Sequence, residues 1–119
     1  MTQQILSELK PDPNALVIMY TTSASNLGVG GQVLVVNQGN SLVNSGNLAA
    51  DYGRDCDFVS LALGPVSGSS IASFIAFETL MPPGHMAQWQ DIYLSPGETI
   101  IVQSRKGQCS FVFTGHTYD

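Results

Sequence analysis

The stretch YLSPGETIIVQS, residues 93–104, decides the fold because it joins two strand-like segments through a strong turn signal. Pro96 fixes the backbone dihedral φ of the second turn residue, and Gly97 accepts the positive φ of the third, as in a type II β-turn. The pattern predicts a β-hairpin whose two strands bury their apolar side chains on one face. These side chains alternate at a two-residue period: Ile92 and Leu94 before the turn, Ile100 and Val102 after it.

Seven segments, counting the two around this turn, have the composition of β-strands, because β-branched and aromatic residues run between breaks of Gly, Pro and Asn. Residues 71–80 also fit one face of a helix, and a strand is the preferred interpretation. Seven short strands, with turn signals between them at about the spacing typical of such folds, predict an all-β fold, a single β-sandwich or jelly-roll-like domain. The expected strands are residues 15–22, 32–36, 57–63, 71–80 and 85–94, the segment from the turn to residue 104, and residues 109–116.

Two of these strands are expected to be covered on both faces. Residues 32–36, QVLVV, form a continuous apolar run, which is typical of a central strand with cover on each side. In the strand before the turn, strict alternation places Trp89 and Tyr93 on one face, opposite the aliphatic residues. Trp89 and Tyr93 fit a core or a subunit interface, and the alternative is an aromatic platform for a sugar or a base.

The amino-terminal residues 1–14 are expected to form a short arm outside the body of the domain, residues 15–119. The arm has apolar residues at Ile5, Leu6 and Leu9, and the stiff connector LKPDPN follows them. Because the prolines separate this apolar group from the first strand, we expect it to contact a neighbouring protein rather than the core.

Two stretches rich in glycine and polar residues are expected to be loops, residues 23–31 and residues 40–55. The glycines of the first lack the GxGxxG order that a phosphate-binding loop needs. The second is long enough to indicate a functional surface, and Leu42 and Tyr52 are its candidate contact residues.

The composition argues against several classes of function. With 119 residues, the chain fits one domain that buries a core without a metal or a disulfide. Charged residues make up 11% and the net charge is −5, so a basic surface for nucleic acid is not expected. No apolar run approaches the roughly 20 residues of a membrane span, and the sequence MTQQILSELK lacks the features of a signal peptide. We therefore expect folding in a cytosol, with Cys56 and Cys109 as free thiols and no membrane partner.

No cluster of residues predicts catalysis, a metal or a cofactor. His85 and His116 lie far apart without a metal-binding spacing, and an exposed turn is the expected position of each. Asp51, Asp55 and Asp57 lack the glycine and the distal glutamate of a calcium-binding loop, so solvated loop carboxylates are expected.

Several fold-level motifs follow one another along nearly the whole chain, and their order resembles a family of short virion structural proteins of tailed bacteriophages, particularly those of cyanobacterial and other aquatic hosts. Residues 40–55 depart from the family pattern, since this loop is longer here. The motifs are the apolar arm, the strand with Met19-Tyr20-Thr21, the strand end with Val35, Asn37 and Gly39, a loose match to a Pro-x-Gly turn at residues 65–68, and the hairpin with Leu94, Pro96, Gly97, Glu98 and Ile100.

The resemblance implies a non-enzymatic virion protein without a cofactor, assembled in the host cytoplasm. We expect a capsid decoration protein that docks on the major capsid protein, or on other virion proteins, through its arm and sandwich faces. Its apolar and aromatic faces predict a homotrimer or another cyclic assembly. The alternatives are a tail or fibre component, and a carbohydrate- or host-surface-binding β-sandwich that uses residues 40–55. The expected partner-binding residues are Ile5, Leu6, Leu9, Leu42, Tyr52, Trp89 and Tyr93.

Overall fold

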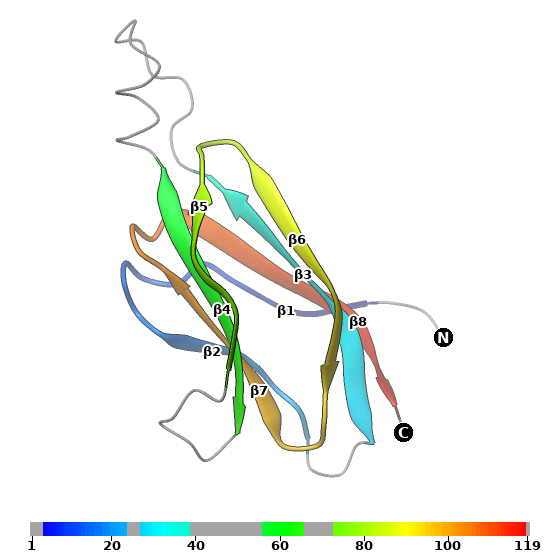
Figure 1. Cartoon of the computed structure of the whole chain (residues 1–119). Helices are drawn as coiled ribbons and strands as arrows, with labels where there is room; N and C mark the ends of the chain where they lie inside the picture. The colour runs from blue at the N-terminus through cyan, green and yellow to red at the C-terminus, as the bar shows by residue number, and fades with distance from the viewer. Residues whose placement is uncertain (1–3, 24–26, 39–55, 66–72, 119) are drawn as a thin grey trace, which may run out of the picture.

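The computed structural model describes residues 4–23, 27–38, 56–65 and 73–118. Within these ranges the regular secondary structure consists of β-strands, without a helix (Figure 1). The strands form two four-stranded antiparallel sheets, sheet A in the order β1-β8-β3-β6 and sheet B in the order β2-β7-β4-β5. The predicted all-β sandwich is therefore confirmed, with eight strands in place of about seven. Their bounds are β1 Gln4–Leu9, β2 Val17–Thr21, β3 Gly28–Asn37, β4 Asp57–Pro65, β5 Ser73–Met81, β6 Met86–Leu94, β7 Glu98–Ser104 and β8 Cys109–Tyr118.

The core lies between the two sheets and is filled from both of them. Sheet A contributes Phe111 and Phe113 of β8, and sheet B contributes Leu61 of β4 and Val102 of β7, all at 0–1% exposure. The ring of Tyr20 on β2 packs against Phe113 with the ring centroids 5.1 Å apart, which joins the two sheets. Burying an aliphatic or aromatic side chain of this kind stabilises the fold by about 1.5–3 kcal/mol.

The turn after β6 has the predicted local geometry. The N–H of Glu98 donates a 3.0 Å hydrogen bond to the carbonyl of Ser95, and Gly97 adopts a φ of 85°. The predicted hairpin, however, is wrong, because β6 pairs with β3 in sheet A while β7 pairs with β2 and β4 in sheet B. The turn therefore carries the chain from one sheet to the other. The aliphatic residues on its two sides still meet in the core, since each sheet presents its own pair to the interior.

The segment expected to be an arm outside the domain is an edge strand of sheet A, in which β1 pairs antiparallel with β8. Leu6 and Leu9 pack against the core, and Ser7 Oγ donates a 2.6 Å hydrogen bond to the carbonyl of Met19 in sheet B. The expectation is corrected for residues 4–9, because pairing with β8 satisfies backbone groups and partly buries the two leucines. The prolines that follow take the chain across to sheet B.

β3 lies centrally in sheet A as expected, but its outer face is not fully covered. Val33 is buried, whereas Leu34 and Val36 are partly exposed, so the predicted cover on both faces is wrong. The strand also begins at Gly28, within residues that we expected to be a loop. β3 and β8 approach closely here, because a Cβ at Gly31 would collide with a backbone carbonyl of β8.

An extra residue in β6 changes which of its side chains face the core. The register against β3 shifts beside Asp91, which adopts a φ of 58°, and this is the geometry of a β-bulge. Trp89 therefore packs against the core on the same side as Ile92 and Leu94. Tyr93 lies on the opposite, exposed face. The predicted face shared by Trp89 and Tyr93 is wrong, because strict alternation ends at the bulge, and the outer face of β6 is not covered.

Candidate functional site

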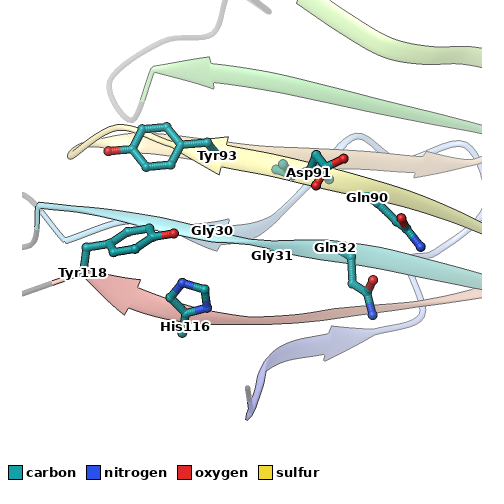
Figure 2. Close-up of a pocket in the computed structure, with 9 residues that line it drawn as sticks. Gly30, Gly31, Gln32, Gln90, Asp91, Tyr93, His116 and Tyr118 are labelled. Atoms are coloured by element: carbon teal, nitrogen blue, oxygen red, sulfur yellow. The ribbon is translucent and has the colours of Figure 1, made fainter. Parts of the chain in front are cut away.

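A groove of about 380 Å³ lies on the outer face of sheet A, where β6, β3 and β8 run side by side (Figure 2). We call it the sheet A groove. Two tyrosines stand at one end of it, and two glutamines stand at the other. Its lining residues are Gly30, Gly31 and Gln32 of β3, Gln90, Asp91, Ile92 and Tyr93 of β6, and His116 and Tyr118 of β8.

Glycines on β3 form the floor beneath the two tyrosine rings. Strand register places Gly30 between Tyr93 and His116, and it places Gly28 opposite Tyr118. A Cβ at Gly28 would collide with the Tyr93 hydroxyl, and a Cβ at Gly30 would lie 3.0 Å from the Tyr118 hydroxyl oxygen. The absence of side chains at these two positions therefore lets both rings lie over the backbone of β3.

The aromatic side chains of the groove contact one another in a fixed arrangement. The ring centroids of Tyr93 and Tyr118 are 6.0 Å apart, with an angle of 44° between the ring planes. His116 meets Tyr118 edge to face, with the centroids 4.7 Å apart. The hydroxyl of Tyr93 donates a 3.1 Å hydrogen bond to the carbonyl of Leu27. These contacts hold the apolar faces of the tyrosines in place before any ligand binds.

The bulge in β6 places polar side chains beside these rings. Asp91 is not a glycine, yet it adopts positive φ, a conformation that costs free energy and is concentrated at functional sites. The amides of Gln32 and Gln90 each offer donors and an acceptor, and the Asp91 carboxylate offers acceptors. The groove therefore combines apolar ring faces with donors and acceptors over a short distance (Figure 2).

A second surface lies on the outer face of sheet B, where strand register aligns apolar residues across all four strands. Ile18 of β2 pairs with Ile101 of β7, Ile101 pairs with Ala62 of β4, and Ala62 pairs with Phe74 of β5. The ring of Phe77 packs edge to face on Phe74, with the centroids 4.8 Å apart. We call these five residues the outer row of sheet B.

The outer row is substantially exposed at both of its ends. Ile18 is 52% exposed, Phe74 is 41% exposed and Phe77 is 63% exposed. Leu80, which pairs with Phe58 further along β5 and β4, adds another exposed apolar side chain at 53%. The middle of the row is buried, with Ile101 at 8% exposure and Ala62 at 0%, so the exposed apolar surface lies along the edge strand β5 and, separately, at Ile18 on β2.

A buried carboxylate organises the turn between β7 and β8. Asp57, expected to be a solvated loop residue, is fully buried, and four donors hydrogen-bond to its carboxylate oxygens in place of water. Burial acts to raise the pKa of Asp57, but these hydrogen bonds together lower it below the ordinary value of 3.8. The donors are the N–H groups of Phe58 at 2.7 Å, Lys106 at 2.8 Å and Gln108 at 3.1 Å, and the hydroxyl of Ser104.

The residues predicted to bind partners are distributed over several parts of the fold. Ile5 is 63% exposed on β1, while Leu6, Leu9 and Trp89 pack against the core of this domain. Of the seven, Tyr93 lines the sheet A groove. Leu42 and Tyr52 lie outside the described residues, as does the loop 40–55 to which they belong.

Most of the groove was not predicted from the sequence. His116, expected in an exposed turn, lies on β8 and lines the groove, whereas His85 is exposed in the turn before β6. The available signal was the group of glycines at positions 28, 30 and 31, because glycine inside a strand often marks close approach of another group. The pairing of β3 with β6 and β8, which brings the lining residues together, has no local signature.

Within the described residues, no group of three or more His, Cys, Asp or Glu side chains is arranged to hold a metal ion. No helix in that part of the chain is long and apolar enough to span a bilayer. Comparison with known proteins found no matching family model, no matching curated protein and no matching solved structure.

Proposed function

We propose that the protein is a non-enzymatic structural subunit of a tailed-bacteriophage virion, with a capsid decoration protein as the first candidate. The exposed apolar side chains of β5 on the outer face of sheet B, Phe74, Phe77 and Leu80, support this proposal, because monomeric soluble proteins rarely expose large apolar patches. The virion context comes from the motif order that resembles short phage structural proteins. On this proposal the major capsid protein is the partner, and a tail or fibre protein is the alternative.

The apolar surface is large enough to anchor a small subunit. Ile18, Phe74, Phe77 and Leu80 are each about half exposed in the isolated chain. Covering the exposed half of each contributes about 1 kcal/mol, so the four together contribute on the order of 4 kcal/mol before ordering costs. A homotrimer would repeat this contribution in every copy, and we propose such a cyclic assembly.

The geometry of β5 favours contact through the face of sheet B rather than addition of another strand. β5 is an edge strand, and such strands pair with other chains unless bulges or charges interrupt them. The register of β5 against β4 shifts twice, and Glu78 adopts a φ of 51°. These irregularities disfavour a continuous ladder along the edge, while the aromatic side chains of β5 remain open to a partner.

The role of the amino-terminal strand in docking is smaller than the sequence predicted. Leu6 and Leu9 pack within their own domain, so Ile5 is the apolar residue of this segment that stays exposed. We therefore propose that Ile5 contributes at the margin and that the outer row provides most of the contact.

The proposal is tested with a double variant, Phe74→Ser with Phe77→Ser, expressed with an affinity tag during phage infection. Met86→Ser is the matched control, because Met86 is 66% exposed on the outer face of sheet A. Quantitative mass spectrometry of purified virions gives copies per particle, and light scattering gives the oligomeric state. We expect the control to be incorporated and trimeric, and the double variant to lose both properties while remaining folded.

Normal incorporation of the double variant, or absence of the unmodified protein from purified virions, would contradict the proposal. A copy number that scales with the major capsid protein would support the capsid location. A copy number that scales with the tail proteins would support the tail alternative.

A further inference from the structure

We propose that the sheet A groove binds a neutral saccharide, with a pyranose ring seated against Tyr93 and Tyr118. This inference does not depend on the virion role, because it rests on a different face of the sandwich. It also differs from the aromatic platform of Trp89 and Tyr93 that the sequence suggested, since Trp89 packs against the core and residues of β3 and β8 take its place.

The two tyrosines provide the apolar part of the site. A pyranose presents C–H groups on its ring face and hydroxyl groups around its edge, so it needs an apolar wall beside polar groups. Tyr93 and Tyr118 present such a wall, with centroids 6.0 Å apart and ring planes inclined by 44°. Gly28 and Gly30 leave room for these rings, and the hydrogen bond from Tyr93 to Leu27 holds one of them in position.

The amide and carboxylate groups provide the polar part of the site. Each sugar hydroxyl both donates and accepts, and the groove offers both functions through Gln32, Gln90 and Asp91. His116 adds a further nitrogen beside Tyr118, on the side of the groove formed by β8 (Figure 2). Mixed donors and acceptors next to aromatic faces suit a polyhydroxylated ring better than a purely apolar ligand.

The charges favour a neutral ligand over an anionic one. Among the described lining residues there is no lysine or arginine, and Asp91 supplies a carboxylate. The whole chain carries a net charge of −5. A phosphate, a sulfated glycan or a uronic acid would therefore meet an unfavourable field, which a neutral hexose would not.

The size and chemistry of the groove fit binding of a short saccharide without cleavage. A volume of about 380 Å³ is near the lower end for small-molecule sites, which suits one or two sugar units of a longer chain. Glycoside hydrolysis ordinarily uses two carboxyl groups on opposite sides of the scissile bond. The described lining contains one, Asp91.

The test is an NMR titration of the full-length, ¹⁵N-labelled chain. The neutral probes are cellotriose, mannotriose and chitotriose, and the contrasting probes are a trimer of galacturonic acid and glycerol. We expect at least one neutral trisaccharide to bind with a dissociation constant of about 1 mM or lower. The shifted amides should map to residues 28–32, 90–93 and 115–118. The acidic trimer and glycerol should cause no saturable shift.

Variants separate the groove from the rest of the surface. Tyr118→Ala should weaken binding about tenfold, because it removes one ring face, while Tyr118→Phe should bind within about twofold of the unmodified protein. Gln90→Ala should weaken binding severalfold. Gln88→Ala is its matched control, since Gln88 is exposed on the same strand outside the groove, and it should leave the affinity unchanged.

Several results would overturn the inference. They are the absence of saturable shifts with every neutral probe, shifts that map away from the groove, and tighter binding of the galacturonic acid trimer than of any neutral probe. Equal affinities for Gln90→Ala and Gln88→Ala would also refute it. If Tyr118→Ala does not fold, the glutamine pair still decides the question, because both side chains are exposed and make no core contact.

Discussion

Asp57→Asn should destabilise the protein far more than a neutralised surface carboxylate would. In the native state one carboxylate oxygen accepts from the N–H groups of Phe58 and Lys106, and the other accepts from Gln108 and Ser104. Asparagine can keep one accepting oxygen. Its NH₂ group would take the place of the other and face the N–H of Gln108, so two donors would oppose each other in a buried site.

The expected loss follows from the value of each contact. Hydrogen bonds to a charged group contribute about 1.5–3 kcal/mol, and neutral ones contribute about 0.5–1.5 kcal/mol, so the two retained bonds weaken by about 1 kcal/mol each. An unsatisfied buried N–H costs a further 1–3 kcal/mol, roughly. Relief from burying a charge offsets part of this sum. We therefore expect a decrease of about 3 kcal/mol in the free energy of unfolding, and a decrease of roughly 10 °C in Tm.

The pH dependence provides a second, independent signature. The hydrogen bonds to Asp57 hold its pKa below the ordinary 3.8 that it has in the unfolded chain. A lowered carboxyl pKa stabilises the native state above the unfolded pKa, and the contribution is lost as the pH falls below it. The difference in stability between the unmodified protein and Asp57→Asn should therefore be constant near neutral pH and shrink below about pH 3.8.

Urea denaturation at neutral pH and at a series of acidic pH values measures both effects. Asp12→Asn is the control, because Asp12 is exposed, and it should change stability by less than about 0.5 kcal/mol. A difference below about 1 kcal/mol for Asp57→Asn at neutral pH would refute the reasoning. So would a difference that stays constant through the acidic range.

Three further predictions test the core and the sheet edges. Thr22 is buried, and its hydroxyl has no hydrogen-bond partner among the described residues, so Thr22→Val should raise stability by about 1 kcal/mol in urea denaturation. Burial, followed by the negative charge of Asp57, raises the pKa of Cys109 from its ordinary value of 9.0 to about 12. In a Cys56→Ser variant, the Cys109 thiol should therefore react with a thiol reagent at about pH 8 only after unfolding. The free energy of unfolding should fall as the pH rises above 9.0, because the thiol then ionises more readily in the unfolded chain. Deleting residues 2–9 removes Leu6 and Leu9, which pack against the core, and should cost about 3 kcal/mol, or roughly 10 °C in Tm. Ile5→Ser should change Tm little, because Ile5 is 63% exposed. An unchanged Tm after the deletion would show that β1 is dispensable for folding.

Those parts of the fold that depend on neighbours in sequence could be predicted. The turn at Pro96 and Gly97 formed as expected because its conformation is set by the φ preferences of two adjacent residues. β7 and β8 followed their alternation because no bulge interrupts their pairing with β4 and β3. Strand composition therefore sufficed for the fold class.

Those features that depend on strand partners could not be predicted in the same way. The alternation around Pro96 is equally compatible with a hairpin and with a crossing between sheets, and the choice depends on β3 being available to pair with β6. The bulge at Asp91 adds one residue without a Gly or Pro to mark it, and this single residue turns Trp89 to the side that packs against the core. The sheet A groove depends on both events, since it needs Tyr93 outside and β3 between β6 and β8.

The positions of the two surfaces lead to one further prediction, that they act independently. The outer row belongs to sheet B and the groove to sheet A, and the core separates the two sheets, so their outer faces point in opposite directions. A subunit docked through sheet B would thus keep its groove open to solvent. Because substitutions at distant sites without shared contacts are additive, Phe74→Ser with Phe77→Ser should leave saccharide affinity unchanged, and Gln90→Ala should leave incorporation into virions unchanged. The NMR titration and the virion copy number, each applied to both sets of variants, measure this directly. Loss of saccharide binding in a folded Phe74 and Phe77 variant would mean that the two faces are coupled through the core, and it would refute their independence.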